Sequence, residues 1–387
     1  MILDVSSKQF ASTKKPIPPT LVGMNLGEIR ALLAERGEPV YRANQIARWL
    51  YREGVSNAND MSDLPRSLRE CLAQEIRISP YEVVVERTAD NNLTRKALLR
   101  LADGSLVETV LMRYPANDRQ RARNTVCVSS QVGCAVGCPF CATGFLGLKR
   151  HLTAGEIIGQ VIYFNQRLRQ LQANDARVTN VVFMGEGEPL ANFQNVWSAI
   201  ELLNAPECVG LGARRVTVST SGLAPRIREL GTKSLEVGLA ISLHAPTDDL
   251  RNRLVPVNRK YPIAELIDAC REYVAQTNRR VSFEYALMRD VNDSIEQART
   301  LARLLDGLLA HVNLIPLNRV EGSPFQPTPW SRMLAFQKTI QASGISCTVR
   351  SERGDAIDGA CGQLRARLEQ SPTANASSPA RRELPDW

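Results

Sequence analysis

Three cysteines of this sequence are spaced closely enough to bind one inorganic centre. They form the run Cys134-Ala-Val-Gly-Cys138-Pro-Phe-Cys141, shortly after Cys127, whereas the other five of the nine cysteines are scattered. In a chain without an export signal, thiols serve metals or catalysis more often than structural disulfides. A structural zinc site usually has four ligands, but this run supplies three. An iron–sulfur cluster can bind a small molecule at an iron without a protein ligand, so the spacing favours a cluster over zinc.

Length and composition place this run in a globular, basic protein. The 387 residues predict one main domain of about 250 residues plus an accessory part. No apolar run approaches the roughly 20 residues that span a bilayer, and the first residues lack the apolar segment of a secretory signal. We therefore expect a cytoplasmic protein without membrane contact. The net charge of +8 suits a polyanionic partner such as a nucleic acid, or simply a basic soluble enzyme.

The elements that must position the cysteines begin with a helical N-terminal part. Residues 1–22 are polar and contain prolines, which predicts a flexible arm. Three helical segments follow, LGEIRALLAERG, YRANQIARWLYREG and LPRSLRECLAQEI, the first ending at Gly37 and the second at Gly54. We expect them to form an N-terminal helical accessory domain over residues 23–95.

A serial α/β domain follows. Asp103-Gly104 between two apolar stretches predicts a β-hairpin. After it, strands and helices alternate, which predicts a parallel sheet, either open or closed into a barrel. We expect this core domain with its hairpin extension over residues 96–368, and a disordered tail over residues 369–387. The strand candidates are TVCVSS, VTNVVFM, RRVTVST, EVGLAISLH, RVSFEYALM and HVNLIPL.

Several stretches together resemble one enzyme family. CVSSQVGCAVGCPFCATG, NVVFMGEGEPL, VTVSTSGL, ISLHAP, LIPLN and DGACGQL are similar to motifs of the RlmN/Cfr family of radical S-adenosylmethionine (SAM) RNA methyltransferases, from about residue 23 to 368. The resemblance implies an α/β fold, a radical-SAM partial (β/α)6 barrel. It also implies that Cys134, Cys138 and Cys141 bind a 4Fe-4S cluster whose fourth iron chelates the amino and carboxylate groups of SAM. An electron donor such as flavodoxin or ferredoxin would serve the cluster.

Candidate SAM contacts fall at the carboxyl ends of the expected strands, where a βα barrel binds its substrate. Small residues there let a ligand approach closely, and Glu188 could accept a hydrogen bond from the methionine ammonium. Each of these residues alone could have a structural role, in a tight turn, as a helix cap or as a buried histidine. Because several strand ends carry such residues at the same mouth of the barrel, together they indicate a binding site. By the resemblance, the SAM contacts are Gly187, Glu188, Ser219, Ser242, Leu243, His244 and Asn318.

Two cysteines outside the cluster receive roles from the resemblance. Cys361, in GACGQL, corresponds to the cysteine that accepts a methyl group, and Cys127 to its partner. One SAM would methylate Cys361, a second would yield a 5′-deoxyadenosyl radical that takes hydrogen from the S-methyl group, and the carbon radical would add to adenine. A base would remove the ring proton, and attack of Cys127 on the sulfur of Cys361 would release the product through a transient disulfide. The alternative is a pair of inert buried thiols.

Two glutamates are harder to assign. Glu108 matches the family's glutamate ahead of the cluster, which implies the proton acceptor. Strand alternation places it on one face with Leu106, Val110 and Met112, and such an apolar face would raise its pKa towards that of a useful base. The alternative is a strand carboxylate paired with an arginine. Glu186 stands where the family most often has methionine, and we expect it to face solvent or to pair with an arginine.

The resemblance implies methylation of carbon 2 of adenosine, in 23S ribosomal RNA at the peptidyl-transferase centre and in tRNA next to the anticodon. That carbon is electron-poor, so the methyl group must arrive as a carbon radical. The Arg-rich linker over residues 113–123 and the N-terminal helices would contact the RNA backbone, or their charges are simply solvated. Three other functions stay open: the sister reaction at carbon 8, which confers antibiotic resistance, a non-catalytic iron–sulfur RNA-binding module, and a radical-SAM enzyme acting on protein or small molecules.

Overall fold

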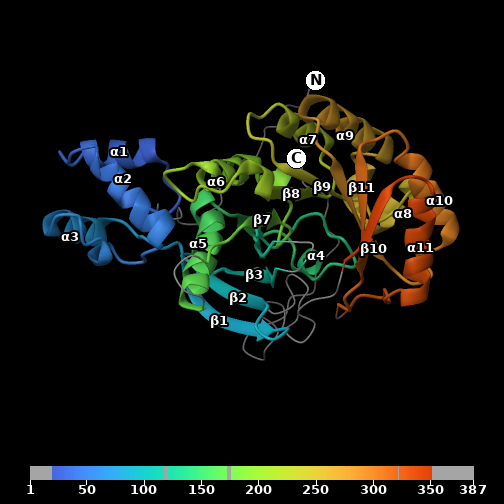
Figure 1. Cartoon of the computed structure of the whole chain (residues 1–387), viewed down its shortest axis with the longest axis horizontal. Coiled ribbons are helices and arrows are strands. Elements are labelled where there is room, and N and C mark those ends of the chain that lie inside the picture. Colours follow the sequence, from blue (N-terminus) through green and yellow to red (C-terminus); the bar gives the residue numbers. More distant parts are fainter. Residues whose placement is uncertain (1–19, 117, 119–120, 172–175, 321, 351–387) are drawn as a thin grey trace, which may run out of the picture.

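The computed structural model describes residues 20–116, 118, 121–171, 176–320 and 322–350. Most of the expected N-terminal arm, the whole of the expected tail and Cys361 lie outside these residues. The described chain contains a group of N-terminal helices, a ten-stranded sheet that curves into an arc, and helices on the convex side of that arc (Figure 1). No helix within the described ranges is long and apolar enough to cross a membrane.

Three helical segments form the N-terminal part, as the sequence predicts. Asn25 begins the first because its side chain accepts a hydrogen bond from the N–H of Glu28, while the Glu28 carboxylate accepts one from the N–H of Asn25, a capping box. Gly54, with a φ of 73°, ends the second in a left-handed conformation that glycine adopts without steric cost. The segments are α1 (Leu26–Ala34), α2 (Arg42–Ala47) continued by the π-helical η1 (Arg48–Glu53), and α3 (Arg66–Glu75), with the short η2 (Ala58–Asp60) ahead of α3.

Three antiparallel strands extend the sheet at one side: β1 (Tyr81–Ala89), β2 (Thr94–Leu101) and β3 (Leu106–Tyr114). The hairpin predicted at Asp103-Gly104 joins β2 to β3, and Gly104 takes a φ of 81° in the turn. The sequence did not predict β1. This strand is the edge of the sheet and none of its residues is buried, so it lacks the long apolar run that marks an interior strand.

Within the described residues, seven parallel strands form the barrel, in the order β4-β7-β8-β9-β10-β11-β12, and β4 joins them to β3. The first six coincide with the six predicted strands, which confirms the α/β class and the partial barrel. The seventh was not predicted because it is short and lies at the edge. A separate pair, β5 (Gln131–Val132) and β6 (Arg150–His151), follows β4. The barrel strands are β4 (Arg123–Cys127), β7 (Asn180–Phe183), β8 (Val216–Thr220), β9 (Gly238–Ser242), β10 (Val281–Leu287), β11 (Ala310–Pro316) and β12 (Ser346–Val349).

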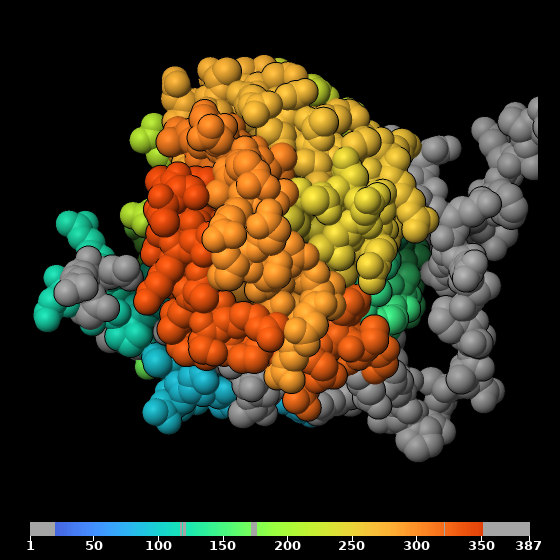
Figure 2. Space-filling model, turned by 90° about the vertical axis from the view of Figure 1, so that its right-hand side faces the viewer, coloured from blue at the N-terminus to red at the C-terminus, as the bar shows by residue number. Residues whose placement is uncertain are grey.

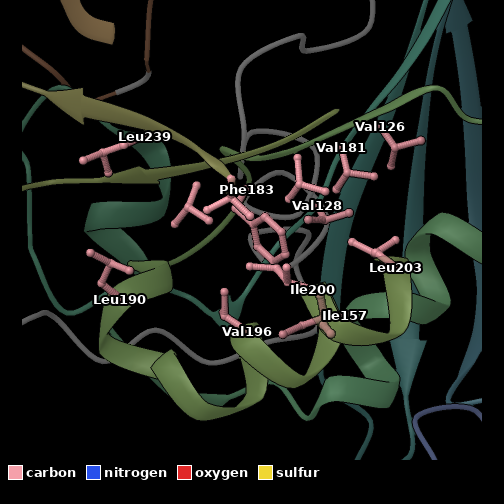
Figure 3. Close-up of a cluster of buried hydrophobic side chains, with 14 of the residues drawn as sticks. Val126, Val128, Ile157, Val181, Phe183, Leu190, Val196, Ile200, Leu203 and Leu239 are labelled. Atoms are coloured by element: carbon pink, nitrogen blue, oxygen red, sulfur yellow. The ribbon is translucent and has the colours of Figure 1, made fainter. Parts of the chain in front are cut away.

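Helices on the convex side bury the outward faces of the strands. Figure 3 shows Val126 of β4 and Phe183 of β7 against Ile157 of α5 and Ile200 of α6, all of them buried. Burial of each such side chain contributes about 1.5–3 kcal/mol. Because side chains alternate along a strand, Cys127 faces the inside of the barrel. The helices are α4 (Ala142–Leu146), α5 (Ala154–Leu171), η3 (Pro189–Asn192), α6 (Phe193–Asn204), η4 (Ala213–Arg215), α7 (Ala224–Gly231), α8 (Asp248–Leu254), η5 (Pro256–Arg259), α9 (Ile263–Thr277), α10 (Ile295–Leu304) and α11 (Trp330–Ala342).

Candidate active site

The cysteine run lies in a tight loop after β4, between β5 and α4. Two backbone hydrogen bonds close the loop, from the N–H of Cys134 to the carbonyl of Gly147 (3.2 Å) and from the N–H of Cys141 to the carbonyl of Cys138 (3.1 Å). Gly133 has a φ of 80°, and a Cβ there would lie 1.8 Å from the Gly147 carbonyl oxygen, so only glycine fits. The turn therefore gathers three thiols onto one short segment at the mouth of the barrel.

The three thiols are close enough to influence one another's charge. Burial raises the pKa of both Cys134 and Cys138, and the nearby Cys141 raises both further. The guanidinium of Arg251 has the opposite effect on the pKa of Cys138. The thiolate forms therefore need additional positive charge, which bound iron would supply. This donor set fits a 4Fe-4S cluster.

Among the residues that the structure describes, no three Cys, His, Asp or Glu side chains converge on a point that one ion could occupy. In a 4Fe-4S cluster each cysteine binds a separate iron.

The side chain of Glu188 connects the loop after β7 to the end of β8 through hydrogen bonds. Its carboxylate accepts hydrogen bonds from the N–H of Leu190 (3.0 Å) and from both the N–H and the hydroxyl of Ser221 (2.7 and 2.6 Å). Burial raises the pKa of Glu188, and the hydrogen bonds oppose that effect. The oxygen bonded to Leu190 keeps a second acceptor position for a ligand ammonium. Gly187 precedes it with a φ of 100°, and a Cβ there would lie 2.5 Å from the Cβ of Gln131.

His244 is held in a left-handed conformation beside the cysteine loop. Its φ is 57°, an uncommon value for a residue other than glycine. Its Nδ1 accepts a hydrogen bond from the N–H of Ala286 (3.0 Å), and its ring meets the ring of Phe140, from the cysteine run, edge to face at 4.9 Å between centres. Burial lowers the pKa of His244 to about 3. The imidazole is therefore neutral near pH 7, with Nε2–H as a donor.

The remaining predicted SAM contacts also lie at strand ends. Ser219 is in β8 and Ser242 is the last residue of β9. Leu243 is fully buried in the hydrophobic core, and its N–H donates to the carbonyl of Glu284. Asn318 follows β11, is half-buried and makes no hydrogen bond with the other described residues. Its amide is thus available to a ligand, whereas Leu243 positions the end of its strand by packing.

Sequence reasoning missed one residue that joins these strand ends, Arg251 of α8. Its side chain is fully buried, and its guanidinium donates to the backbone carbonyls of Ser221 (2.5 Å), Ser242 (3.2 Å) and Leu243 (3.1 Å). Burial lowers the pKa of Arg251 to about 10, so it is still charged near pH 7. Arg253 in the same helix is exposed, and nothing in the local sequence DDLRNRL distinguishes the two.

Glu108 lies where strand alternation places it, but its surroundings differ from the prediction. One of its carboxylate oxygens, Oε2, is 2.7 Å from Nζ of Lys96 on β2, and both side chains are buried. Val110 of β3 is paired with Lys96 on the neighbouring strand β2 and with Cys127 on the neighbouring strand β4. Glu108 lies two residues from Val110 on β3, so its side chain is on the same face of the sheet as those of Lys96 and Cys127. The prediction that the face around Glu108 is otherwise apolar was wrong, because Lys96 lies there. The alternative predicted an arginine as the partner of Glu108, whereas the partner is a lysine. Cross-strand neighbours depend on register, which alternation does not give.

The structure contradicts the first of the two settings predicted for Glu186, because its side chain does not face solvent. Its side chain is 0% exposed, and its carboxylate accepts hydrogen bonds from the backbone N–H groups of Glu108 (3.0 Å) and Gly133 (3.4 Å). It links the strand that carries Glu108 to the start of the cysteine loop. Glu186 is buried because β4 pairs with β3 only from Val110 onward. The backbone N–H of Glu108, which precedes Val110, therefore needs another buried acceptor.

Cys127 and Cys361 cannot be compared directly, since Cys361 lies outside the described residues. Cys127 is buried at the end of β4. Ahead of Cys361, Arg350 places its guanidinium 3.7 Å from Sδ of Met112 on β3. Met112 shares the sheet face of Glu108, since side chains alternate. The segment that leads to Cys361 therefore starts beside the face that carries Cys127.

Two family models match the chain. The model of the ribosomal RNA large subunit methyltransferase N-terminal domain matches residues 20–78, and that of the radical SAM superfamily matches residues 128–302. A probable dual-specificity RNA methyltransferase RlmN from Roseiflexus castenholzii is 47% identical over 393 residues, which cover 91% of this chain and 97% of that protein. A protein of the same name from Chloroflexus aurantiacus is 50% identical over 355 residues, which cover 90% and 93%.

Among solved structures, that of a radical SAM methyltransferase from Sphaerobacter thermophilus is similar throughout. Its TM-score is 0.85 and its sequence identity 49%, and the match covers 90% of this chain and 99% of that one. The similarity therefore includes both the helical N-terminal part and the barrel.

Proposed function

Since the chain belongs to the RlmN family of radical-SAM methyltransferases, we propose that it methylates carbon 2 of adenosine in RNA. The proposed substrates are 23S ribosomal RNA at the peptidyl-transferase centre and tRNA next to the anticodon. The observation that carries the proposal is the placement of Cys127 and Glu108 on one buried face of the sheet, beside the cysteine loop.

The register of β3 and β4 supports roles for both residues in product release. Cys127 faces Val110, and Glu108 is the next residue on that face. Diagonal neighbours on antiparallel strands lie about 7–8 Å apart, so an adenine between them is within reach of both. A carboxylate there can remove the ring proton, and a thiol there can attack the sulfur that carries the base.

Lys96 orients the base. Its ammonium contacts Oε2 of Glu108 at 2.7 Å, and this ion pair holds the carboxylate that would accept the ring proton. Glu186 holds the backbone of Glu108 from the other side through the hydrogen bond to its N–H. The base is thus fixed in both side chain and main chain.

The cofactors are held by the residues at the mouth. Cys134, Cys138 and Cys141 would bind the 4Fe-4S cluster. When bound, the cluster and SAM supply the one-electron chemistry that removes hydrogen from an unactivated methyl group, and we propose that each turnover uses two SAM molecules. Arg251 fixes the ends of β8 and β9, and the rings of Phe140 and His244 exclude water beside the cysteine loop. The strand-end residues that would contact SAM are Gly187, Glu188, Ser219, Ser242, Leu243, His244 and Asn318.

Cys361 is the proposed methyl carrier. Its thiolate attacks the methyl carbon of SAM, which forms the S–CH₃ bond and releases S-adenosylhomocysteine. Eleven residues separate it from Arg350 (361 − 350), and an extended chain of that length spans at most about 36–40 Å. Because Arg350 already lies beside Met112, this segment is long enough to bring Cys361 to Cys127 for the transient disulfide.

We also propose an electron donor, a cellular location and a domain boundary. The one-electron chemistry calls for a donor such as flavodoxin or ferredoxin, and RNA methylation calls for a cytoplasmic location. The main sheet begins at Tyr81, inside the accessory domain expected over residues 23–95. We therefore place the boundary between the helical domain and the core near residue 79.

Nucleoside mass spectrometry tests the proposal. Anaerobically reconstituted enzyme receives methyl-deuterated SAM, a reductant and unmodified 23S ribosomal RNA or tRNA. Labelled 2-methyladenosine is expected, and it should vanish with Cys361→Ala. Cys71→Ala is the matched control and should retain activity, because Cys71 lies on α3, outside the barrel. Labelled 8-methyladenosine would replace the proposal with the sister reaction, and SAM cleavage without any methylated adenosine would overturn the RNA substrate.

A further inference from the structure

The end of the barrel opposite the cysteine loop carries a row of arginines. They precede or begin four of the parallel strands, β4, β7, β8 and β10, and are far apart in the sequence. Because parallel strands all start at the same edge of a sheet, the fold brings these residues together. We call this set the basic rim: Arg121, Arg123, Arg177, Arg214, Arg215, Arg279 and Arg280.

Two hollows lie in the basic rim. One, of about 590 Å³, is formed by the segments that lead into β4, β7 and β8, and it is lined by Arg121, Arg123, Arg177 and Arg215. Its described lining contains no aspartate or glutamate. The second, of about 550 Å³, contains the other three arginines and one acidic residue, Glu236. A concave, strongly basic surface of this kind suits an anionic ligand.

Most of the charge of the basic rim is not neutralised by the described protein. Arg214 pairs with Glu236 at 2.9 Å, and none of the other six has an ion pair with a described residue. The guanidinium of Arg123 lies over the ring of Tyr114 at 4.2 Å, which leaves its N–H edge to a ligand. The buried Nε of Arg279 has no hydrogen-bond partner among the described residues. Arginines on the outer helices α9 and α10 pair instead with neighbouring carboxylates.

The basic rim is remote from the cysteine loop. β8 runs from Val216 at the rim to Thr220 at the mouth, and the four steps between these residues span about 13 Å. In Figure 2 the linker that leads into β4 projects at the left edge (teal), whereas the segment around α4 (green) lies at the right edge. A ligand in the basic rim is therefore not in contact with the group that reacts at the mouth.

We propose that the basic rim binds the phosphodiester backbone of the RNA substrate, at a site distant from the modified base. Guanidinium groups match phosphate oxygens in bidentate geometry, and phosphate contacts provide most of the sequence-independent affinity for nucleic acids. A folded RNA of tens of nucleotides is longer than the barrel, so one part of it presents adenosine at the mouth while another lies across the rim. An acidic electron-donor protein fits less well, because it must approach the cysteine loop at the other end. The inference takes from the proposed function only that the substrate is RNA.

Two charge-matched triple variants test this inference. The rim variant carries Arg123→Gln, Arg177→Gln and Arg215→Gln. The control variant carries Arg271→Gln, Arg299→Gln and Arg303→Gln, which remove three exposed arginines from the outer helices. Both lower the net charge equally. The probe is a fluorescein-labelled, unmodified tRNA transcript, and its binding to the cluster-loaded enzyme is measured from about 50 to 200 mM salt.

The rim variant should bind the tRNA at least about 10-fold more weakly, and its plot of log K against log salt should be shallower by about 2–3, since each phosphate contact contributes about 0.7–0.9 to the slope. The control variant should differ from wild type by less than about 2-fold. The KM for RNA should rise in the rim variant while kcat stays unchanged. Arg→Lys at the same three positions should restore the slope, because the charges return, but not the full affinity.

Equal weakening by both triple variants would overturn the inference and leave only an effect of net charge. Unchanged tRNA binding together with slower reduction by a flavodoxin would assign the basic rim to an acidic protein instead. Binding of tRNA is measured separately from methylation. If the proposed reaction fails, the binding data therefore still show whether the basic rim contacts RNA. If the rim variant folds poorly, the affinity of the Arg→Lys variant tests the inference in its place, because lysine keeps the charge but loses the bidentate phosphate contacts. Binding of tRNA as tight as that of wild type would then contradict the inference.

Discussion

The two ends of the barrel differ in how their charged side chains are placed and paired. At the mouth, Lys96, Glu108 and Arg251 are buried and each is held by fixed partners. At the basic rim the arginines lie at the surface, and among the described residues only Arg214 has a carboxylate partner. Chemistry on a carbon–hydrogen bond needs groups held within a few tenths of an ångström, whereas backbone binding needs only a density of positive charge. Single substitutions should therefore act strongly at the mouth and weakly at the rim.

The largest effect is expected from Glu108→Gln. General base catalysis contributes about 10²–10⁴-fold, and the initial rate of 2-methyladenosine formation should fall by that factor. The change also leaves Lys96 buried without its anion, which should lower the free energy of unfolding by about 3–5 kcal/mol. Adding Lys96→Met should recover most of the stability and none of the activity. A double variant that regained activity would make Glu108 a structural partner of Lys96 and not the base.

Arg251→Met should have the next largest effect. It removes three hydrogen bonds from a buried cation to backbone carbonyls, and denaturant unfolding should show a loss of about 3–5 kcal/mol. The affinity for SAM, measured by equilibrium dialysis, should fall at least about 10-fold, because the ends of β8 and β9 lose their common anchor. Arg253→Met on the exposed side of the same helix is the control and should change either quantity little. Unchanged SAM binding in a folded Arg251→Met protein would show that the strand ends need no such anchor.

A pH dependence should distinguish the buried histidine at the mouth. The pKa of His244 is lowered from 6.5 to about 3 in the folded state, so the unfolded chain takes up a proton below about pH 6.5 that the folded chain refuses. The stability from this group is complete above that pH and is lost as the pH falls towards 3. Between about pH 7.5 and 5.5, urea unfolding should show wild type losing about 1.4 kcal/mol more than His244→Gln. Parallel curves for the two proteins would mean that His244 charges freely in the folded state.

The smallest effect at the mouth is expected from Glu186→Met, which introduces the residue most common in the family. The variant loses two hydrogen bonds to backbone N–H groups but also removes a buried carboxylate. These opposing effects should leave the free energy of unfolding within about 1 kcal/mol and the initial rate within about 5-fold. A loss as large as that of Glu108→Gln would instead show that Glu186 positions the base in this chain.

The parts of the site that depend on spacing along the chain could be predicted from the sequence. The cysteine run and the GEGEP segment each follow a recognisable strand, and Gly133 and Gly187 make the local turns that bring them to the mouth. Alternation along β3 likewise predicted which residues of that strand share the sheet face of Glu108. These inferences succeeded because each depends on a few neighbouring residues.

The partners of these residues could not be predicted, because they come from other elements. Lys96 meets Glu108 only through the register of β2 and β3. Arg251 is buried by the packing of α8 against two strand ends, and its local sequence is that of an exposed helix. The basic rim was visible only as the linker before β4, because the remaining arginines join it only when the parallel strands align.

Disulfide mapping after a single turnover tests the proposed reaction most directly. The cluster-loaded enzyme would react once with unmodified tRNA in the absence of thiol reductant and then be quenched with an alkylating reagent. We expect one Cys127–Cys361 linked peptide for each 2-methyladenosine formed, with the buried Cys208 recovered as an unlinked thiol. Formation of 2-methyladenosine while Cys127 and Cys361 are both recovered alkylated would contradict the release of the product by Cys127.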